Sequence, residues 1–148
     1  MNESPPKNGN GRRPIVGMVI AVVGFAIFIL GTSPELFGLD RSPVIGFVQI
    51  TVFLIGLAII CIGGYLSLIS MWNGRQRTIG ADIGMRLVAT GYVIAVASGL
   101  ADVFGFGSQP WPQIPSFGRW QSRGVLIGEV IIAVGFLLML PPRPLKKD

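Results

Sequence analysis

The second half of this chain repeats its first half, and this repeat constrains the fold more than any other feature of the sequence. When residues 46–66 are aligned with residues 118–138 at a constant offset of 72, nine of the 21 positions are identical. The identical pairs are Gly46/Gly118, Gln49/Gln121, Leu54/Leu126, Ile55/Ile127, Gly56/Gly128, Ile59/Ile131, Ile60/Ile132, Gly63/Gly135 and Leu66/Leu138. A weaker match aligns residues 14–38 with residues 81–105 at an offset of 67. The repeat predicts that each half contains the same structural elements in the same order.

The apolar character of both halves indicates that the chain lies in lipid. Hydrophobic residues make up 51% of the 148 residues and charged residues only 13%, which is far from the composition of an ordinary soluble protein. The four apolar stretches cover residues 14–34, 42–74, 83–103 and 124–142, and the last two carry charges only at Arg86, Asp102 and Glu129. Each stretch is close to or above the ~20 residues that an α-helix needs to cross a bilayer core of ~30 Å. The predicted fold class is therefore an all-α integral membrane protein, with four transmembrane helices arranged as two tandem parallel-repeat helical hairpins that form a compact bundle.

The predicted organisation follows from the apolar stretches and the segments between them. We expect a disordered cytoplasmic tail at 1–13, a first hairpin at 14–74 with spans at about 15–33 and 44–71, a second hairpin at 79–142 with spans at about 82–103 and 121–140, an aromatic and proline-rich outer loop at 104–122, and a basic cytoplasmic tail at 143–148. Arg12 and Arg13 followed by an apolar run are also typical of a cleaved secretory signal. Retention is favoured because the first span has a repeat partner inside the chain.

The distribution of Lys and Arg predicts the orientation. Eight of them lie in the N-terminal tail, the middle loop and the C-terminal tail, and three lie in the two remaining connections. Because positive loops stay on the cytoplasmic side, both termini should be cytoplasmic, in a plasma membrane of the bacterial type. Both halves then enter from the same side, which predicts a parallel duplication about an axis along the membrane normal. The net charge of +5 fits retention and contact with anionic lipid headgroups better than nucleic-acid binding.

Small residues recur along the predicted spans. In lipid, small residues let helix backbones approach closely where large side chains would hold them apart. We predict helix-packing roles for Gly17, Ala21, Gly24, Gly56, Gly63, Gly91, Ala95, Gly99, Gly124, Gly128 and Gly135. Contacts inside the bundle are the favoured interpretation, and a homodimer face is the alternative.

Glu129 is the only acidic residue well inside an apolar span, which makes it the first candidate for a functional intramembrane site. Counted from Gly124, it should lie ~8 Å below the outer boundary at the rise of an α-helix. Its repeat partner is Leu57, so the first half supplies no second carboxylate. We expect Ser98 at a similar depth on the third span and predict a hydrogen bond between Glu129 and Ser98. The pair fits a structural polar clasp best, and a transport role is the alternative.

Two further acidic positions carry structural predictions. Asp82 and Arg86 are four residues apart with the acid first, the favourable order for an ion pair on one helix face. This pair should set the start of the third span near the cytoplasmic interface, with a lipid-headgroup or ligand site as the alternative. Glu35 and Asp102 are repeat equivalents that each precede a Phe-Gly pair, and their recurrence predicts the same turn in both halves.

The outer loop is rich in aromatic residues and proline. Tryptophan at a membrane boundary anchors at the level of the lipid headgroups. Trp111, Phe117 and Trp120 are the candidates for interaction in this loop. An aromatic cap on the outer surface is the favoured interpretation, and a docking platform for a partner subunit or a lipid is the alternative.

Residues for catalysis or for cofactor binding are missing from the sequence. There is no histidine, and the single cysteine, Cys61, lies mid-span, so the usual zinc, haem and iron–sulfur ligand sets are absent. Neither a nucleophile elbow nor a phosphate-binding loop is present, and no cofactor is predicted. We therefore expect a non-enzymatic accessory or structural subunit that acts through helix and outer-loop contacts. Its expected partners are the lipid bilayer and other membrane subunits or further copies of itself, not nucleic acid. The alternatives are a small oligomeric transporter or channel that uses Glu129 and, less favoured, a membrane-surface sensor.

Overall fold

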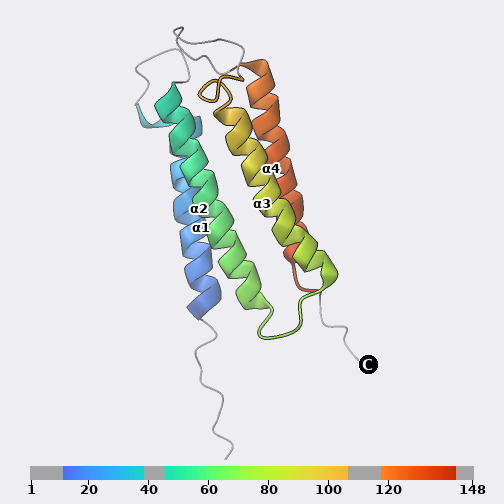
Figure 1. Ribbon diagram of the computed structural model, residues 1–148. Coiled ribbons are helices and arrows are strands. Elements are labelled where there is room, and N and C mark those ends of the chain that lie inside the picture. Colours follow the sequence, from blue (N-terminus) through green and yellow to red (C-terminus); the bar gives the residue numbers. More distant parts are fainter. Residues whose placement is uncertain (1–11, 39–45, 107–117, 143–148) are drawn as a thin grey trace, which may run out of the picture.

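The described part of the chain is entirely helical. The computed structural model describes residues 12–38, 46–106 and 118–142. Within these ranges the elements are α1 (Arg12–Thr32), the short 3-10 helix η1 (Pro34–Phe37), α2 (Phe47–Met71), α3 (Ile79–Gly99) and α4 (Arg119–Met139). The four α-helices lie alongside one another and alternate in direction (Figure 1). All four are long and apolar enough to span a membrane, which confirms the predicted all-helical class at this level.

The two ends of the bundle differ in what they contain. One end, the turn end, holds the start of α1, the turn between α2 and α3, and the end of α4 (Figure 1). The other end, the loop end, holds the end of α1 with η1, the start of α2, the end of α3 and the start of α4. Each α-helix overlaps the span predicted for it, with boundaries that differ by a few residues.

Local capping explains two of these differences in boundary. The Thr78 hydroxyl accepts a hydrogen bond from the Ala81 backbone N–H at 3.2 Å, so α3 begins at Ile79 rather than at about residue 82. At the start of α4, the Gly118 backbone N–H donates to Gln121 Oε1 at 2.6 Å. This bond satisfies a donor that the helix itself leaves unpaired, and α4 begins at Arg119.

The turn predicted for both halves is present in both. The Gly38 backbone N–H donates to the Glu35 carbonyl at 3.1 Å, and the Gly105 N–H donates to the Asp102 carbonyl at 3.2 Å. The φ angles of Gly38 and Gly105 are +66° and +78°, a region that side chains other than glycine rarely adopt. The Phe-Gly pairs therefore mark the same backbone reversal after α1 and after α3.

Within each hairpin the two helix backbones touch through glycine. A methyl carbon placed on Gly24 would lie 2.6 Å from the Ile60 backbone nitrogen, and one placed on Gly91 would lie 2.6 Å from the Gly128 carbonyl oxygen. The contacts recur at corresponding positions of the two halves, because Gly17 meets Gly63 in the first hairpin and Gly84 meets Gly135 in the second. Further positions with the same property are Gly31, which meets the Phe53 backbone, and Gly56, which meets the Phe28 backbone.

The glycines at these contacts follow a spacing of seven residues. The sets are Gly17, Gly24 and Gly31 on α1, Gly56 and Gly63 on α2, Gly84 and Gly91 on α3, and Gly128 and Gly135 on α4. A seven-residue repeat keeps one helix face against its neighbour when two helices wind around each other with a left-handed twist. The packing therefore uses this longer spacing, whereas GxxxG motifs use four residues.

Between the hairpins, large side chains replace glycine. The buried cluster comprises Ile50, Phe53, Leu54, Leu57, Val88, Ala95, Val125, Ile132 and Met139. Two hydrogen bonds also join the hairpins: the Trp72 indole N–H donates to the Met139 carbonyl at 3.0 Å, and the Tyr92 hydroxyl donates to the Leu54 carbonyl at 3.5 Å. The Trp72 side chain is only 5% exposed, so the first of these bonds lies in a dry environment.

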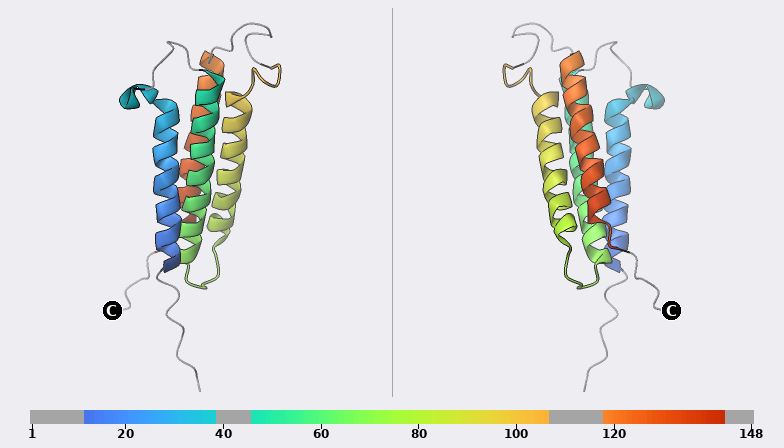
Figure 2. Two further views of the ribbon diagram at one scale, coloured as in Figure 1. Left: turned by 90° about the vertical axis from the view of Figure 1, so that its left-hand side faces the viewer. Right: turned by 90° about the vertical axis from the view of Figure 1, so that its right-hand side faces the viewer.

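The bundle is less evenly packed than a compact four-helix bundle would be. α1 lies at one margin and α3 at the opposite margin, with α2 and α4 between them (Figure 2). α2 contacts both α3 and α4, but no Cα atom of α1 lies within 8 Å of one in α3 or α4. One side of α4 is consequently left uncovered by α1.

Candidate functional site

A cavity of about 230 Å³ lies at the loop end, where α1 and α4 fail to meet. We call it the Glu129 cleft. Its lining residues are Gly31 and Thr32 from α1, Gln49 and Phe53 from α2, and Ser122, Val125, Leu126 and Glu129 from α4. The cleft therefore brings Glu129 together with polar side chains from all three of these helices.

Helix geometry explains why Glu129 faces this cavity. Of the four lining residues of α4, Val125 and Leu126 each lie three or four positions from both Ser122 and Glu129, which places the set on one face of the helix. α4 begins at Arg119, so Glu129 lies at the middle of the helix, about 15 Å from its first residue at the α-helical rise. Helical side chains lean toward the N-terminal end of their helix, and for Glu129 this is the loop end. The Glu129 side chain is therefore expected to lean toward the loop end, where Thr32 and Gln49 also line the cleft.

The polar groups of the cleft differ in how far they are already hydrogen-bonded. The Thr32 hydroxyl lies within donating distance of the Phe28 and Ile29 carbonyls, at 3.1 and 3.3 Å, so its proton is used within α1. Gln49 is the repeat equivalent of Gln121, but no side chain caps the start of α2 at Gly46. Its amide lines the cleft instead. The Glu129 carboxylate, the Gln49 amide and the Ser122 hydroxyl are therefore the groups that a molecule in the cleft would meet.

The hydrogen bond predicted between Glu129 and Ser98 is not among the contacts of the described residues. Ser98 lies against α4 at a different position, where a side chain on Gly124 would overlap the Ser98 hydroxyl. Gly124 and Glu129 are five residues apart, a rotation of about 140° around the helix axis at 3.6 residues per turn. Ser98 thus contacts α4 on the side that faces α3, whereas the Glu129 side chain lies on the side of α4 that faces the cleft and α1.

The ion pair predicted between Asp82 and Arg86 is also not formed among the described residues. Both side chains are exposed on α3, and the Thr90 hydroxyl donates to the Arg86 backbone carbonyl at 2.8 Å. An exposed pair of this kind gains little energy, because holding two long side chains in one geometry is entropically unfavourable. The start of α3 is set by the Thr78 cap rather than by this pair.

The aromatic candidates of the outer loop are only partly within the described residues. Trp120 lies in the first turn of α4 and is 77% exposed, and the Arg123 guanidinium lies 5.5 Å from the centre of its ring. Such a cation–π contact suits a membrane boundary, where one group is apolar and the other is charged. Trp111 and Phe117 lie outside the described residues.

The predicted helix-packing residues lie where α-helices meet. Gly17, Gly24, Gly56, Gly63, Gly91, Gly128 and Gly135 face the backbone of the partner helix in their own hairpin, and Ala21 and Ala95 supply backbone nitrogens to such contacts. Gly99 instead meets the side chains of Ile50, Leu54 and Val125 at 3.4–3.6 Å, and so lies between the hairpins. Sequence reasoning did not select Gly31 or Gly84, although the seven-residue spacing contains both.

Two further residues were not singled out from the sequence. Trp72 joins the hairpins at the turn end, and Gln49 lines the Glu129 cleft. Trp72 ends an apolar stretch just before Asn73 and Gly74, a position that is typical of an exposed boundary tryptophan and gave no signal of a buried partner. For Gln49, the repeat itself held a signal, because an amide recurred at a position in an otherwise apolar span.

The Glu129 cleft offers polar groups to a bound molecule. No three His, Cys, Asp or Glu side chains gather within residues 12–38, 46–106 and 118–142 in a way that suits a metal ion. One carboxylate beside an amide offers acceptors for a cation or for hydrogen-bond donors.

Comparison with known proteins identifies no relative, because no family model, curated protein or solved structure matches the chain.

Proposed function

We propose that this protein is a multi-pass integral membrane protein that acts as a non-enzymatic accessory or structural subunit and receives a partner at the Glu129 cleft. The lengths of the helices support the membrane location, since 21 residues span about 32 Å at the α-helical rise and the bilayer core is ~30 Å thick. The surface supports it as well. Large apolar side chains that face outward include Ile15, Met18, Val22, Val93, Leu126, Val130 and Leu137, each at least 55% exposed. Contiguous apolar surface of this kind is unusual for a soluble monomer.

The charges of the described residues support an orientation with the turn end in the cytoplasm of a bacterial-type cell. Arg12, Arg13, Arg75 and Arg77 lie at the turn end, whereas Arg119 and Arg123 lie at the start of α4 at the loop end. Positive charge is retained on the cytoplasmic side of a plasma membrane. Both termini would then be cytoplasmic, and the Glu129 cleft would open near the outer face.

The correspondence of glycine contacts supports an origin by duplication of one hairpin. Gly17 with Gly63 and Gly84 with Gly135 are the same contact at offsets of 67 and 72, the offsets found in the sequence. Two hairpins with the same direction fit a parallel repeat about an axis along the membrane normal.

The observation that carries the functional proposal is the position of the cleft. It lies on the side of α4 that α1 leaves uncovered, and it places a carboxylate and an amide beside apolar surface. Polar groups inside a membrane are costly to leave without partners, and polar contacts hold helices together there. A helix of another subunit that carries a hydrogen-bond donor would fill this cleft.

Site-specific photo-crosslinking in intact membranes tests this function. A photoreactive residue in place of Leu126, which lines the cleft, should form a crosslink to a membrane protein. The same residue in place of Val130, an exposed position on α4 outside the cleft, is the matched control and should not. The E129L variant should weaken the crosslink from position 126. Equal crosslinking from both positions, or crosslinking to lipid alone, would contradict a docking role.

A small oligomeric transporter or channel is the second candidate function. It is favoured by the meeting of polar side chains from three helices at Glu129, which a transport pathway requires. It is disfavoured by the backbone contacts of Gly24 and Gly56, which close the space between α1 and α2 on the way to the turn end. Purified protein in liposomes should show no proton or cation flux. Flux that is lost in the E129Q variant, with the fold retained, would reverse the order of the two functions.

A further inference from the structure

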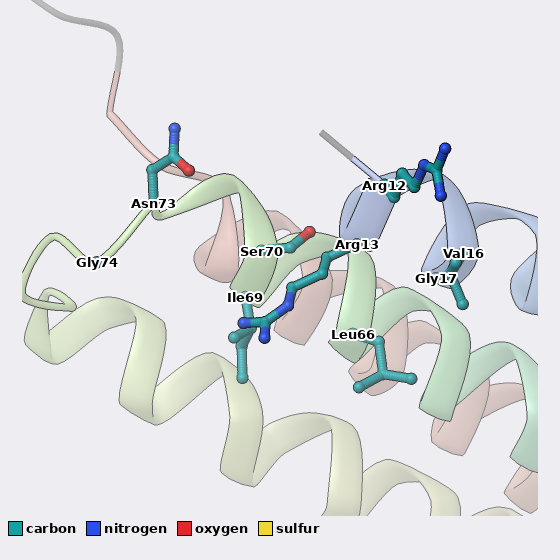
Figure 3. A pocket seen from close by; sticks show the side chains of 9 residues that line it. All are labelled: Arg12, Arg13, Val16, Gly17, Leu66, Ile69, Ser70, Asn73 and Gly74. Atoms are coloured by element: carbon teal, nitrogen blue, oxygen red, sulfur yellow. The ribbon is translucent and has the colours of Figure 1, made fainter. Parts of the chain in front are cut away.

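A second cavity, of about 560 Å³, lies at the turn end between the start of α1 and the end of α2. We call it the Arg pocket. Its lining residues are Arg12, Arg13, Val16, Gly17, Leu66, Ile69, Ser70, Asn73 and Gly74 (Figure 3). Its volume falls within the roughly 300–1,000 Å³ that ligand pockets occupy. The pocket shares no lining residue with the Glu129 cleft.

The Arg pocket is cationic at its mouth. Arg12 and Arg13 are adjacent and exposed, no acidic residue lines the cavity, and neither arginine has an acidic partner among the described residues. The Arg13 side chain reaches across α2 toward Ile69, whereas Arg12 remains on the α1 side (Figure 3). Two guanidinium groups that line one cavity offer donors to an anion, and phosphate is an anion whose geometry they match well.

The walls of the Arg pocket are apolar. Val16 from α1 and Leu66 and Ile69 from α2 line it toward the middle of the bundle. The Ser70 hydroxyl donates to the Ser67 carbonyl at 2.6 Å, so it supplies no free donor for a small anion. A free phosphate ion would gain nothing from these walls, whereas an acyl chain would. The combination of a cationic mouth and an apolar wall fits an amphiphile with a negatively charged head.

The second hairpin lacks this combination, which separates the Arg pocket from the shared packing of the two halves. Ile79 and Gly80 stand at the positions that correspond to Arg12 and Arg13, and Pro141 and Pro142 at those that correspond to Ile69 and Ser70. The charges therefore belong to the first hairpin alone and are not needed to pack a hairpin of this kind.

We propose that the Arg pocket binds an anionic phospholipid, with the phosphate between the Arg12 and Arg13 guanidinium groups and the acyl chain along Val16, Leu66 and Ile69. The proposal rests on the membrane location proposed above, but not on the docking role of the Glu129 cleft. Basic pockets between transmembrane helices are a known means of holding anionic lipid headgroups. The bound lipid would seal the turn end of the first hairpin.

Native mass spectrometry of the purified full-length protein in detergent tests the lipid site. Added dioleoylphosphatidylglycerol should bind at least tenfold more tightly than dioleoylphosphatidylcholine, which has the same acyl chains and no net charge. The R12Q/R13Q variant should bind phosphatidylglycerol about thirtyfold more weakly, the size expected when two basic side chains near an anionic lipid are lost at about 1 kcal/mol each. The R12K/R13K variant, which keeps the charge but loses the planar fork, should lie between the two.

The R75Q/R77Q variant is the matched control. It loses the same charge at the same end of the molecule, but neither arginine lines the Arg pocket. Its affinity for phosphatidylglycerol should stay within about twofold of the unchanged protein. An equal loss in both double variants would overturn the proposal, because the binding would then reflect net charge alone.

Two further outcomes separate this proposal from others. Inorganic phosphate that competes with phosphatidylglycerol at equal concentration would overturn the lipid site in favour of a phosphate site. Tags on the termini that are accessible from outside intact cells would contradict the proposed orientation. If Arg12 and Arg13 still controlled phosphatidylglycerol binding in that case, the lipid site would stand in the opposite leaflet.

Discussion

The contacts within the hairpins and the contacts between them are built from different residues. Inside each hairpin, glycines such as Gly24 and Gly91 bring backbone against backbone, and no side chain can adjust to relieve a clash. Between the hairpins, Leu54, Val125 and their neighbours meet through side chains that have alternative rotamers. The contacts within a hairpin therefore leave less room for adjustment than the contacts between the hairpins.

The two hairpins face each other along two seams, one between α2 and α3 and the other between α1 and α4. These seams differ in how closely they are packed. In the α2–α3 seam, Gly99 of α3 faces the side chains of Ile50 and Leu54 from α2, and Val125 of α4 lies beside the same glycine. The corresponding α1–α4 seam is open and holds the Glu129 cleft. Leu57, the repeat equivalent of Glu129, is 5% exposed and belongs to the buried cluster. The molecule has therefore closed one of two equivalent seams and left a carboxylate at the other.

The largest expected effect comes from a side chain placed inside a hairpin. In G84L, the new Cβ would lie 2.5 Å from the Gly135 carbonyl oxygen, a backbone atom that cannot move away. We expect a loss of about 3 kcal/mol or more in the free energy of unfolding, because this overpacking acts on the backbone. Unfolding by SDS from detergent micelles measures it.

The control for this prediction is G80L, one turn earlier on the same helix. The nearest atom to a Cβ at Gly80 is the Thr78 hydroxyl oxygen, at 3.8 Å. Both substitutions replace glycine with leucine in α3, and the gain in helix propensity at the interior position 84 would work against the expected loss, so the difference between them reports the contact. Equal stability of the two variants would show that the α3–α4 contact is not tight.

The second prediction compares the closed seam with the open seam at identical residues of the repeat. Leu54 is 4% exposed in the α2–α3 seam, and its equivalent Leu126 is 59% exposed at the Glu129 cleft. L54A should lower the free energy of unfolding by about 2–4 kcal/mol, because it leaves a void in packed surroundings. L126A should lower it by less than about 1 kcal/mol. The same SDS unfolding measurement distinguishes them, and similar losses would remove the distinction between the seams.

The third prediction concerns the hydrogen bond that joins the hairpins at the turn end. W72F removes the indole N–H and leaves the buried Met139 carbonyl without its donor, which should lower the free energy of unfolding by about 1 kcal/mol. W120F, at an exposed position of α4, should change it by much less. Thermal unfolding followed by circular dichroism provides the comparison. If the W72F protein were as stable as the original, the Trp72–Met139 hydrogen bond would not contribute to holding the hairpins together.

The smallest expected change in stability is that of E129L, which gives the open seam the residue of the closed seam. We expect a gain of less than about 1 kcal/mol, because the unfolded chain in a micelle also keeps this position in an apolar medium. A loss of stability greater than this would assign Glu129 a structural role in the bundle. The crosslink from position 126 reports the separate effect on a partner.

The helices were accessible to sequence reasoning because long apolar stretches and a repeat leave few alternatives for a chain of this length. The shared Phe-Gly turn was accessible for the same reason, since Gly38 and Gly105 recur at one offset. The exact helix starts were not. They depend on single caps such as Thr78, and a threonine before an apolar run occurs in many settings.

For the candidate site, the sequence did not predict which neighbouring helix each side chain faces. The expected depth of Glu129 along its helix suggested a contact with Ser98 at the same level. Which helix a side chain meets depends instead on its rotation around the helix axis, and the sequence pattern did not determine that rotation. Five residues between Gly124 and Glu129 are enough to turn one toward α3 and the other toward α1. The exposed pair of Asp82 and Arg86 failed for a different reason, because correct spacing alone does not hold two solvated side chains together.

The seven-residue interval between the contact glycines limits how the length of these helices can change. A single residue inserted between Gly17 and Gly24 would rotate every later position of α1 by about 100° and carry Gly24 and Gly31 away from α2. An insertion of seven residues would restore the register but lengthen the span by about 10 Å, a third of a bilayer core. An insertion or deletion therefore changes either the register of the glycine contacts or the length of the helix. Substitution of an outward-facing side chain changes neither and should be tolerated far better.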